Sequence, residues 1–525
     1  MDILNLQTGL NLIDKLPGSD PEAADRGIKR FLDSLLNVPP TAAVYLALLE
    51  RLLPVVAVTG HQLAKQYQGK ALPLSREEDA LFQRVVDTWL KLASAYTHCA
   101  RLDALDLGGA DLTRLALILH RCLYFTGLAI GEHHRVRRQM AAGLWLDLHG
   151  YYARAEEWGV ATLEIPDALG QPSQGTHCRT VFLAPLLTEL AEPCFLPARD
   201  MEWVARLAGR WASLVALRPP LADEALPPFL IDLAQDKDLS VSSACMDRAA
   251  LRCLDVAKLV RRLRRVRDHL DNGVEPEALD LGGTHSPGQC KGLLDTLITP
   301  WSLESARREF ARYHASGIAR LCFGFPAMHT HVSGQPSVHD LGVISYSPDQ
   351  LQSFLTFRYR VDPATSLQVD QEADDHQVDV WEVLDQSAAG FRLRRTHAGR
   401  RLVHGQLLAI APHDGVCFLL GHITWLMQER AGGLVAGVAL LPGIPSAIMA
   451  RRRVERGEDS AEYCQCFLLP AVPAVDAERT LILPLGMFRI GKTLEVISGT
   501  VWMARMEHIL AEGADFERVG IAATE

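Results

Sequence analysis

The spacing of apolar residues divides the chain into two parts with different periods. In roughly the first 300 residues, apolar side chains recur every three or four positions, which is typical of amphipathic helices. A Ser75-x-x-Glu78 capping-box signature introduces one such run, which comprises Ala80, Leu81, Val85, Trp89 and Ala93. Another run, with arginines on its opposite face, comprises Leu259, Leu263, Val266 and Leu270. The pattern predicts an all-α region over residues 1–300, for which stacked antiparallel helix pairs are one arrangement.

From about residue 300 onward, a period of two replaces the helical spacing. Val and Ile become more frequent, and glycine interrupts the pattern at short intervals, which favours short β-strands. Residues 301–450 form one such β unit, and a charged stretch at 451–459 opens a last β-rich segment over residues 451–525. That last segment is predicted to be either a second small barrel or an extension of the first β unit.

Composition limits the function of a chain of this length. Its 525 residues are too many for one hydrophobic core and indicate about two to four domains. A net charge of −10 disfavours a general nucleic-acid binder, which would carry a basic surplus. The N-terminus shows no signal peptide, and no run reaches the roughly 18 apolar residues of a membrane span. Eleven dispersed cysteines indicate reduced thiols, so we expect a cytoplasmic protein without a membrane span.

A polar interruption in the β-rich part carries the strongest candidate chemistry. Residues 385–390 read Asp-Gln-Ser-Ala-Ala-Gly between segments that alternate with period two on both sides. Asp385 and Ser387 are two apart on an extended segment, so their side chains are expected to point the same way. Gly390 allows a sharp turn or the close approach of a flat ligand, because it has no Cβ. A carboxylate, a hydroxyl and this clearance together suit the recognition of a purine edge.

The pattern D-x-S-x-x-G, followed by Gly421-His422-Ile423-Thr424-Trp425-Leu426, resembles the PilZ domain, a small β-barrel that binds cyclic di-GMP. The layout also resembles that of proteobacterial PilZ proteins with a long helical N-terminal part. The resemblance implies a multi-domain α+β fold, in which an all-α region precedes an antiparallel β-barrel and a further small β segment. It also implies that Asp385, Ser387 and Gly390 contact cyclic di-GMP.

PilZ domains usually carry a second motif, R-x-x-x-R, on the segment that leads into the barrel. Arginine suits this role because its planar fork matches guanine edges and phosphate oxygens and stacks on purines. Arg308 and Arg312 have this spacing but lie more than 70 residues before Asp385, whereas Arg358 and Arg360 lie closer with a different spacing. We favour Arg308 and Arg312, because residues 318–332 could supply the first barrel strand, with an insertion behind it. Arg358 and Arg360 stay the alternative pair.

Three other patterns have simpler interpretations. Residues 486–493 match the phosphate-loop consensus G-x-x-x-x-G-K-[ST], but a strand instead of a helix follows them, so we predict a β-hairpin. The stretch with His329, His331, His339 and Asp340 lacks a clear set of three or four metal ligands, so these residues are interpreted as turn and strand-edge positions. The arginines between 261 and 267, and the pair His133-His134, are interpreted as polar helix faces.

The sequence contains no recognisable nucleophile–base pair, paired carboxylate site or cofactor loop, so it predicts no enzyme, no cofactor and no metal. The favoured hypothesis is a cytosolic effector that binds cyclic di-GMP and relays it to a protein partner. Motility or pilus machinery is the partner that the family resemblance suggests. The rival is a degenerate PilZ-like scaffold that binds proteins and no nucleotide. A scaffold of that kind would tolerate loss of the arginine segment.

Overall fold

The computed structural model divides into two compact units. The helical unit comprises Met1–Lys70 and Leu74–Arg307, and the barrel unit comprises Ala71–Pro73 and Arg308–Glu525. The structure describes residues 5–106, 111–166, 176–241, 247–303, 313–315, 317–333, 378–397, 399–412, 415, 417–452 and 463–524.

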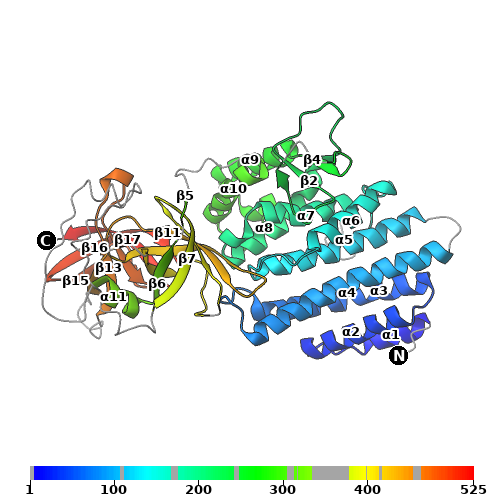
Figure 1. Cartoon of the computed structure of the whole chain (residues 1–525), viewed down its shortest axis with the longest axis horizontal. Helices are drawn as coiled ribbons and strands as arrows, with labels where there is room; N and C mark the ends of the chain where they lie inside the picture. The colour runs from blue at the N-terminus through cyan, green and yellow to red at the C-terminus, as the bar shows by residue number, and fades with distance from the viewer. Residues whose placement is uncertain are drawn as a thin grey trace. The chain divides into compact units, whose positions relative to one another are not determined.

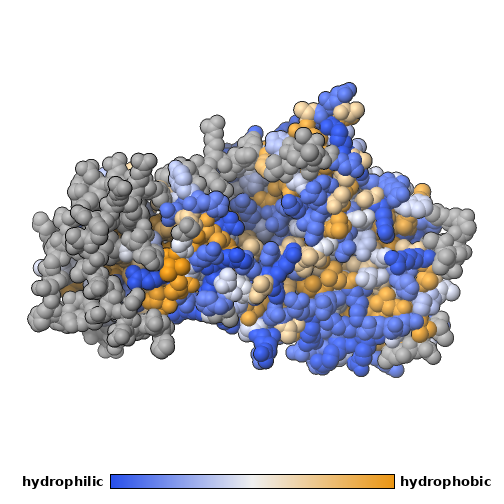
Figure 2. Space-filling view, viewed as in Figure 1, coloured by the Kyte–Doolittle hydropathy of each residue, from blue (hydrophilic) through white to orange (hydrophobic). Residues whose placement is uncertain are grey.

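The helical unit is built from long amphipathic helices, drawn from blue to green in Figure 1. The described helices of this unit are α1 (Leu6–Asp14), α2 (Pro21–Asn37), α3 (Ala42–Tyr67), α4 (Arg76–Asp106), α5 (Leu112–Arg135), α6 (Leu144–Glu157), α7 (Cys178–Leu190), α8 (Ala198–Trp211), α9 (Ala257–Asp271) and α10 (Pro287–Trp301). In α2, for example, Ile28 and Leu32 are fully buried, whereas Glu22 and Arg30 are exposed. Figure 2 shows the hydrophilic surface that results over this helix.

Local sequence signals account for several helix ends and faces. The predicted capping box is confirmed at the start of α4: the Ser75 N–H donates to Glu78 Oε2 at 2.8 Å, and the Glu78 N–H donates to Ser75 Oγ at 3.2 Å. In α9 the buried residues are Leu259, Leu263, Val266 and Leu270, as the spacing predicted. Of the arginines of α9, Arg261, Arg264 and Arg265 are exposed, so the polar face of this helix is also confirmed.

A small antiparallel sheet interrupts the helical unit and was not predicted from the sequence. It has the order β1-β4-β2-β3, with β1 (Ala216–Arg218), β2 (Phe229–Asp232), β3 (Ser240–Val241) and β4 (Leu251–Asp255). These strands have two to five residues, which is too short for a period of two to be recognised. The loop after β2 also caps a helix, because Asp236 Oδ2 accepts from the Gly143 N–H at 2.7 Å, just before α6.

His133 and His134 are a second departure from the sequence analysis. Both side chains are buried, at 4% and 6% exposure, so they do not form the polar face that was predicted. His134 Nε2 lies 2.5 Å from Glu189 Oε2 of α7, and the ring of His133 packs edge-on against Phe82 of α4. The misreading arose because polar residue type was taken to mean exposure, whereas a paired histidine can be buried at a helix–helix contact.

Two helices, α3 and α5, have the length and apolar composition that a membrane span requires. The sequence analysis had expected no such segment. Both helices contribute fully buried side chains to the core of the helical unit, including Leu48 and Leu52 of α3 and Leu123 of α5. A core helix passes the same test of length and composition, so this finding does not by itself identify a span.

The first barrel of the barrel unit is a ring of six antiparallel strands with one short strand added. Its strands are β5 (Tyr313–His314), β6 (Ile318–Phe323), β7 (Val378–Ser387), β8 (Gly390–Arg395), β9 (Leu407–Pro412), β10 (Leu419–Gln428) and β11 (Leu434–Leu440). The order is β5-β7-β6-β9-β10-β11-β8, and pairing between β7 and β8 closes the ring. β5 and β6 pair with successive stretches of the same strand, β7. Leu72 joins this unit through backbone hydrogen bonds with Leu402.

The chain after β6 does not continue as a strand, which corrects one expectation. Residues 318–332 were predicted to form the first barrel strand, but the strand ends at Phe323 and α11 (Phe325–Ser333) follows. His329 and His331 therefore lie on a helix and not at a strand edge, while His339 and Asp340 lie outside the described residues. The positive φ of Gly324, +86°, permits the abrupt change from strand to helix.

The second barrel is closed, with the order β12-β13-β14-β17-β16-β15. Its strands are β12 (Ser446–Arg452), β13 (Cys464–Leu469), β14 (Thr480–Pro484), β15 (Thr493–Ser498), β16 (Thr500–Glu512) and β17 (Phe516–Thr524). Of the two alternatives for the last segment, a second barrel is therefore correct, although it begins at Ser446, before residue 451. A strand, β15, follows residues 486–493, as expected for a connection that is not a phosphate loop. The predicted β-hairpin is wrong, because these residues connect β14 to β15, which are not neighbours in the barrel. Figure 1 shows these strands in orange to red.

One hydrophobic cluster joins the two barrels within the barrel unit. It contains Leu407 and Phe418 from the first barrel, Phe467 and Phe516 from the second, and Met328 of α11. A hydrogen bond crosses the same junction, from the backbone N–H of Leu407 to the side-chain Oδ1 of Asp515 at 2.8 Å. The shared core holds the two barrels and α11 together.

Candidate ligand-binding groove on the first barrel

A β-bulge in β7 positions the candidate site. Trp381 and Val383 are buried in the barrel, as period-two alternation requires. The register with β8 then shifts between Val383 and Asp385, which leaves Leu384 as the extra residue. Beyond the bulge, Asp385 lies directly opposite Arg392, so these two side chains share the outer face of the hairpin.

The bulge forms one wall of an open groove with a volume of about 570 Å³. On the other edge of β7, His314 of β5 pairs with Asp385, and Ile318 of β6 pairs with Glu382. The short connection between β5 and β6 therefore crosses the chain beside the bulge. The lining residues are His314, Ala315, Gly317, Ile318, Glu382, Val383, Leu384, Asp385 and Arg392. We call this site the barrel groove.

Two opposite charges of the barrel groove face each other without a tight contact. Arg392 Nη1 lies 3.8 Å from Asp385 Oδ2, and their side chains are 45% and 17% exposed. The Arg392 guanidinium also lies 5.9 Å from the ring centroid of Trp425. Because Arg392 is exposed and the two groups are 3.8 Å apart, we expect this ion pair to contribute only about 1 kcal/mol, which a phosphate or a guanine edge at Arg392 can offset. The groove thus offers a carboxylate and a guanidinium to a ligand.

The structure gives Ser387 and Gly390 roles inside the hairpin. The Ser387 side chain is 9% exposed, and its hydroxyl donates to the Gly390 carbonyl at 3.4 Å. A Cβ on Gly390 would lie 1.9 Å from the Val438 carbonyl oxygen of β11, so the packing of the strands already requires glycine here. Neither residue lines the barrel groove. Of the three predicted motif residues, the structure therefore brings Asp385 alone to the groove.

All four candidate arginines lie outside the described residues: Arg308, Arg312, Arg358 and Arg360. The next described residue after Arg312 along the chain is Tyr313, which pairs with Gln386 of β7, next to Asp385.

Sequence reasoning missed Arg392 and His314, although a signal for Arg392 was present. Phe391 and Leu393 were recognised as the alternating apolar positions of β8, which places Arg392 on the outer face. A two-residue turn at Ala388-Ala389 then sets Arg392 opposite Asp385 unless a bulge intervenes, and here the bulge lies just beyond that pair. His314 could not be found in this way, since β5 has two residues and no pattern of its own.

The described residues contain no group of three or more His, Cys, Asp or Glu side chains that could hold a metal ion. The barrel groove offers a carboxylate and a guanidinium for hydrogen bonding and ion pairing with a ligand. A helical unit, two joined β-barrels and a charged groove beside a bulge define a multi-domain α+β protein with a candidate ligand-binding site.

Comparison with known proteins relates both ends of this chain to one kind of receptor. Residues 9–222 match the family model "Cyclic-di-GMP receptor FimW, N-terminal domain", and residues 449–523 match "FimW C-terminal beta-barrel domain". The second match coincides with the second barrel, from β12 to β17. The chain is thus similar, at both ends, to a family of cyclic-di-GMP receptors. Residues 223–448, which include the first barrel, lie between the two matches.

A curated relative and a solved structure complete the comparison. "Cyclic-di-GMP receptor FimW" of Pseudomonas aeruginosa is 22% identical over 403 residues, which cover 67% of this chain and 63% of the relative. The alignment thus spans somewhat less than two thirds of the relative's length. A structure described as "MrkH, A novel c-di-GMP dependence transcription regulatory factor" is 8% identical and covers 29% of this chain and 74% of that one, with a TM-score of 0.12. A score this low carries no argument about the fold.

Proposed function

We propose that this protein is a cytoplasmic cyclic di-GMP effector without enzymatic activity, and that the barrel groove of a PilZ-like first barrel is its nucleotide site. Asp385 would accept from the guanine N–H groups, and Arg392, with Arg308 and Arg312, would bind phosphate and stack on the base. The similarity to cyclic-di-GMP receptors supports the ligand. The described cysteines are free thiols, which supports a reducing compartment.

The observation that carries the proposal is the pairing of Tyr313 with Gln386 and of His314 with Asp385. Arg308 and Arg312 precede Tyr313 in the sequence, although they lie more than 70 residues before Asp385. The pairing of β5 with β7 supports our choice of this arginine pair, because it brings residues 313 and 314 beside Asp385 despite that separation.

The ligand would act through a change at the groove that a protein partner detects. Binding that draws Arg392 and the arginine segment onto a nucleotide would alter the charge and order of the surface around β5 and β7. A protein of motility or pilus machinery is the partner that we infer from the family resemblance. No described residue identifies that partner.

Calorimetric titration of the full chain with cyclic di-GMP, with GTP as control, tests the nucleotide site. We expect Asp385→Ala and Arg392→Ala each to weaken binding at least about tenfold, because each removes a charged hydrogen-bond partner of the ligand. Arg394→Ala is the matched control: it lies on the same strand, is 40% exposed and pairs with Glu429 at 3.0 Å, but does not line the groove. Equal binding by all three variants would refute the site.

One observation favours the rival, a scaffold that has lost its ligand. Arg392 already faces Asp385, and the hairpin itself accounts for Ser387 and Gly390, so that no motif residue demands a nucleotide. The same titration separates the two hypotheses. A scaffold gives neither heat nor a thermal shift with cyclic di-GMP at saturating concentration, in wild type and variants alike.

A further inference from the structure

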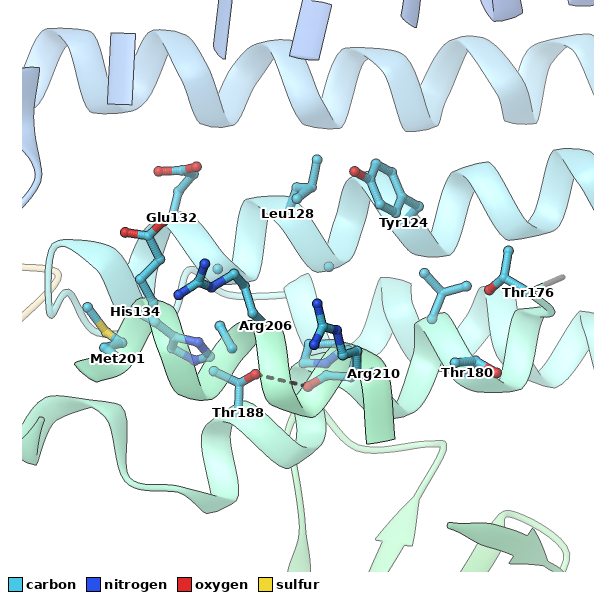
Figure 3. A pocket seen from close by; sticks show the side chains of 18 of the residues that line it. Tyr124, Leu128, Glu132, His134, Thr176, Thr180, Thr188, Met201, Arg206 and Arg210 are labelled. Atoms are coloured by element: carbon cyan, nitrogen blue, oxygen red, sulfur yellow. Dashed lines mark hydrogen bonds between the residues drawn. The ribbon is translucent and has the colours of Figure 1, made fainter. Parts of the chain in front are cut away.

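The helical unit contains a groove of its own, larger than the barrel groove. It has a volume of about 820 Å³ and lies between α5 and α8, with α7 as its floor (Figure 3). Along α5 its lining runs from His120 to Arg135, which corresponds to about 22 Å of helix. Apolar and hydroxyl side chains of α7 form the floor, including Val181 and Thr188, and Leu128 of α5 lines one wall. We call this site the helical groove.

Glycines line the helical groove at positions where the fold does not need them. A Cβ on Gly131 of α5 or on Gly209 of α8 would meet no described atom within 4 Å. Glycine inside a helix lowers stability relative to alanine, because the unfolded chain gains freedom. Gly390, by contrast, is required by packing, because a Cβ there would clash with a neighbouring carbonyl oxygen. The glycines of the helical groove instead keep its walls clear, which is useful where a flat ligand must lie against a helix.

A buried histidine supplies an independent observation that points to a ligand. The His134 side chain lines the helical groove and is 6% exposed. Its Nε2 pairs with Glu189 at 2.5 Å, whereas its buried Nδ1 has no hydrogen-bond partner among the described residues. Buried polar atoms without partners are rare in native proteins, and each one calls for an explanation. Because this Nδ1 is itself covered, a ligand atom in the groove reaches it only after the His134 ring turns.

Two guanidinium groups one helical turn apart face the helical groove from α8. Figure 3 shows Arg206 and Arg210 extending toward α5, which carries Leu128 and Tyr124. Both arginines are exposed. Arg206 donates to Thr284 Oγ1 at 3.4 Å and has no ion pair among the described residues. Arg210 Nη1 lies 3.4 Å from Asp280 Oδ1. Residues four apart on a helix have Cβ atoms about 5–6 Å apart. This spacing suits two phosphate groups of one ligand.

Four acidic residues line the helical groove, and one of them, Asp280, pairs with Arg210, so a phosphate at Arg210 shares or displaces that contact. Glu132 is already neutralised, because its carboxylate accepts from Arg135 Nε at 2.9 Å and from the Tyr67 hydroxyl at 2.7 Å. Glu164 and Glu202 are exposed at the rim, where solvent and salt screen them. Tyr124, half-buried on the wall opposite α8, offers an aromatic surface for a base.

We propose that the helical groove binds a phosphate-bearing purine nucleotide. Its phosphates contact Arg206 and Arg210, its base lies against Tyr124 over the open glycine positions, and a polar atom meets His134 Nδ1. Arg206 and Arg210 have the same spacing in the sequence as Arg308 and Arg312. The proposal goes beyond the barrel groove and stands on residues of the helical unit alone. A peptide in the groove is the competing occupant.

The test uses the full chain carrying Asp385→Ala, so that the barrel groove is disabled, with cyclic di-GMP and GTP as separate probes in calorimetry. We expect at least one probe to bind, and Gly131→Phe or the pair Arg206→Ala/Arg210→Ala to weaken its binding at least tenfold. Gly150→Phe is the matched control for the first change, since Gly150 is an exposed glycine of α6 with no atom within 4 Å of a built Cβ. Arg261→Ala/Arg265→Ala on α9 has the same spacing and controls for lost charge.

The outcomes separate the two sites. Nucleotide binding that survives Asp385→Ala and falls in the groove variants alone supports the helical groove, whatever the barrel groove does. Binding in the wild-type chain that Asp385→Ala abolishes leaves the barrel groove intact and overturns this proposal. No binding of either probe in any variant overturns both, and leaves a peptide as the occupant to be considered for the helical groove.

Discussion

Acid should destabilise the helical unit through two buried histidines that are neutral in the native state. Burial and the neighbouring Arg121 guanidinium lower the pKa of His120 to about 3. Burial likewise lowers the pKa of His149 to about 4, partly opposed by its hydrogen bond with the Gln235 carbonyl at 3.1 Å. An unfolded histidine titrates near 6.5. As pH falls below that value, the unfolded chain therefore binds protons that the native chain does not.

The magnitude follows from proton linkage. For a group with a native pKa well below 5 and an unfolded pKa of about 6.5, lowering the pH from 7.5 to 5.0 removes about 2 kcal/mol from the free energy of unfolding. His120 and His149 together remove about 4 kcal/mol if they act independently. His177 shifts in the same direction, because burial and Arg179 lower its pKa. A native domain has about 5–15 kcal/mol in total, so the loss is large.

Urea unfolding followed by far-ultraviolet circular dichroism, which reports mainly the helices, measures this effect at pH 7.5 and 5.0. The variants His120→Gln and His149→Gln remove the titrating group while keeping hydrogen-bonding capacity. We expect each to reduce the difference in unfolding free energy between the two pH values by about 2 kcal/mol. A difference that both variants leave unchanged would refute the assignment of acid sensitivity to these histidines.

Two further predictions concern the barrel unit. Asp379→Asn should lower the free energy of unfolding of this unit, measured in urea, by about 3–5 kcal/mol, because it leaves the fully buried Arg395 guanidinium without the carboxylate that now lies 2.6 Å away. The control, Glu429→Gln, removes the partner of the exposed Arg394 and should cost about 0–1 kcal/mol. Equal losses in the two variants would contradict the argument. In timed alkylation read by peptide mass spectrometry, Cys464 should react before Cys417. A hydrogen bond from Cys466 lowers the pKa of the Cys464 thiol, whereas burial raises the pKa of the Cys417 thiol. Faster labelling of Cys417 would contradict this prediction.

The sequence predicts the parts of this fold in which one local rule acts over many residues. The apolar face of α9 and the capping box of α4 were found because helical spacing and capping are local. The small sheet of the helical unit was missed because strands of two to five residues are defined by their partners. Likewise, residues 325–333 read as a continuation of β6, and only packing against both barrels makes them a helix.

The candidate barrel site was predictable in part for the same reason. Asp385 was identified from a local motif, and the alternation of β8 contained the position of Arg392. The pairing of β5 with β7 brings Tyr313 and His314 beside Gln386 and Asp385, which are more than 70 positions away in the sequence. A short strand has too few residues to specify such a pairing in one sequence. The burial of His134 was missed because its partner, Glu189, lies on a different helix.

Packing explains some glycines of this chain and leaves others unexplained. Gly390 and Gly437 sit where a Cβ would lie within about 2 Å of the Val438 carbonyl oxygen or of Trp425, so their neighbours exclude any side chain. Gly131 and Gly209 lie in helices, where alanine is more stable, and no described atom stands within 4 Å of a built Cβ. A residue that lowers helix stability without improving packing indicates that a functional requirement acts at its position. Open helical glycines also occur outside the helical groove, as Gly150 of α6 shows. The expectation that the helical unit binds a ligand of its own therefore rests on the coincidence of Gly131 and Gly209 with the arginines of α8 along one groove.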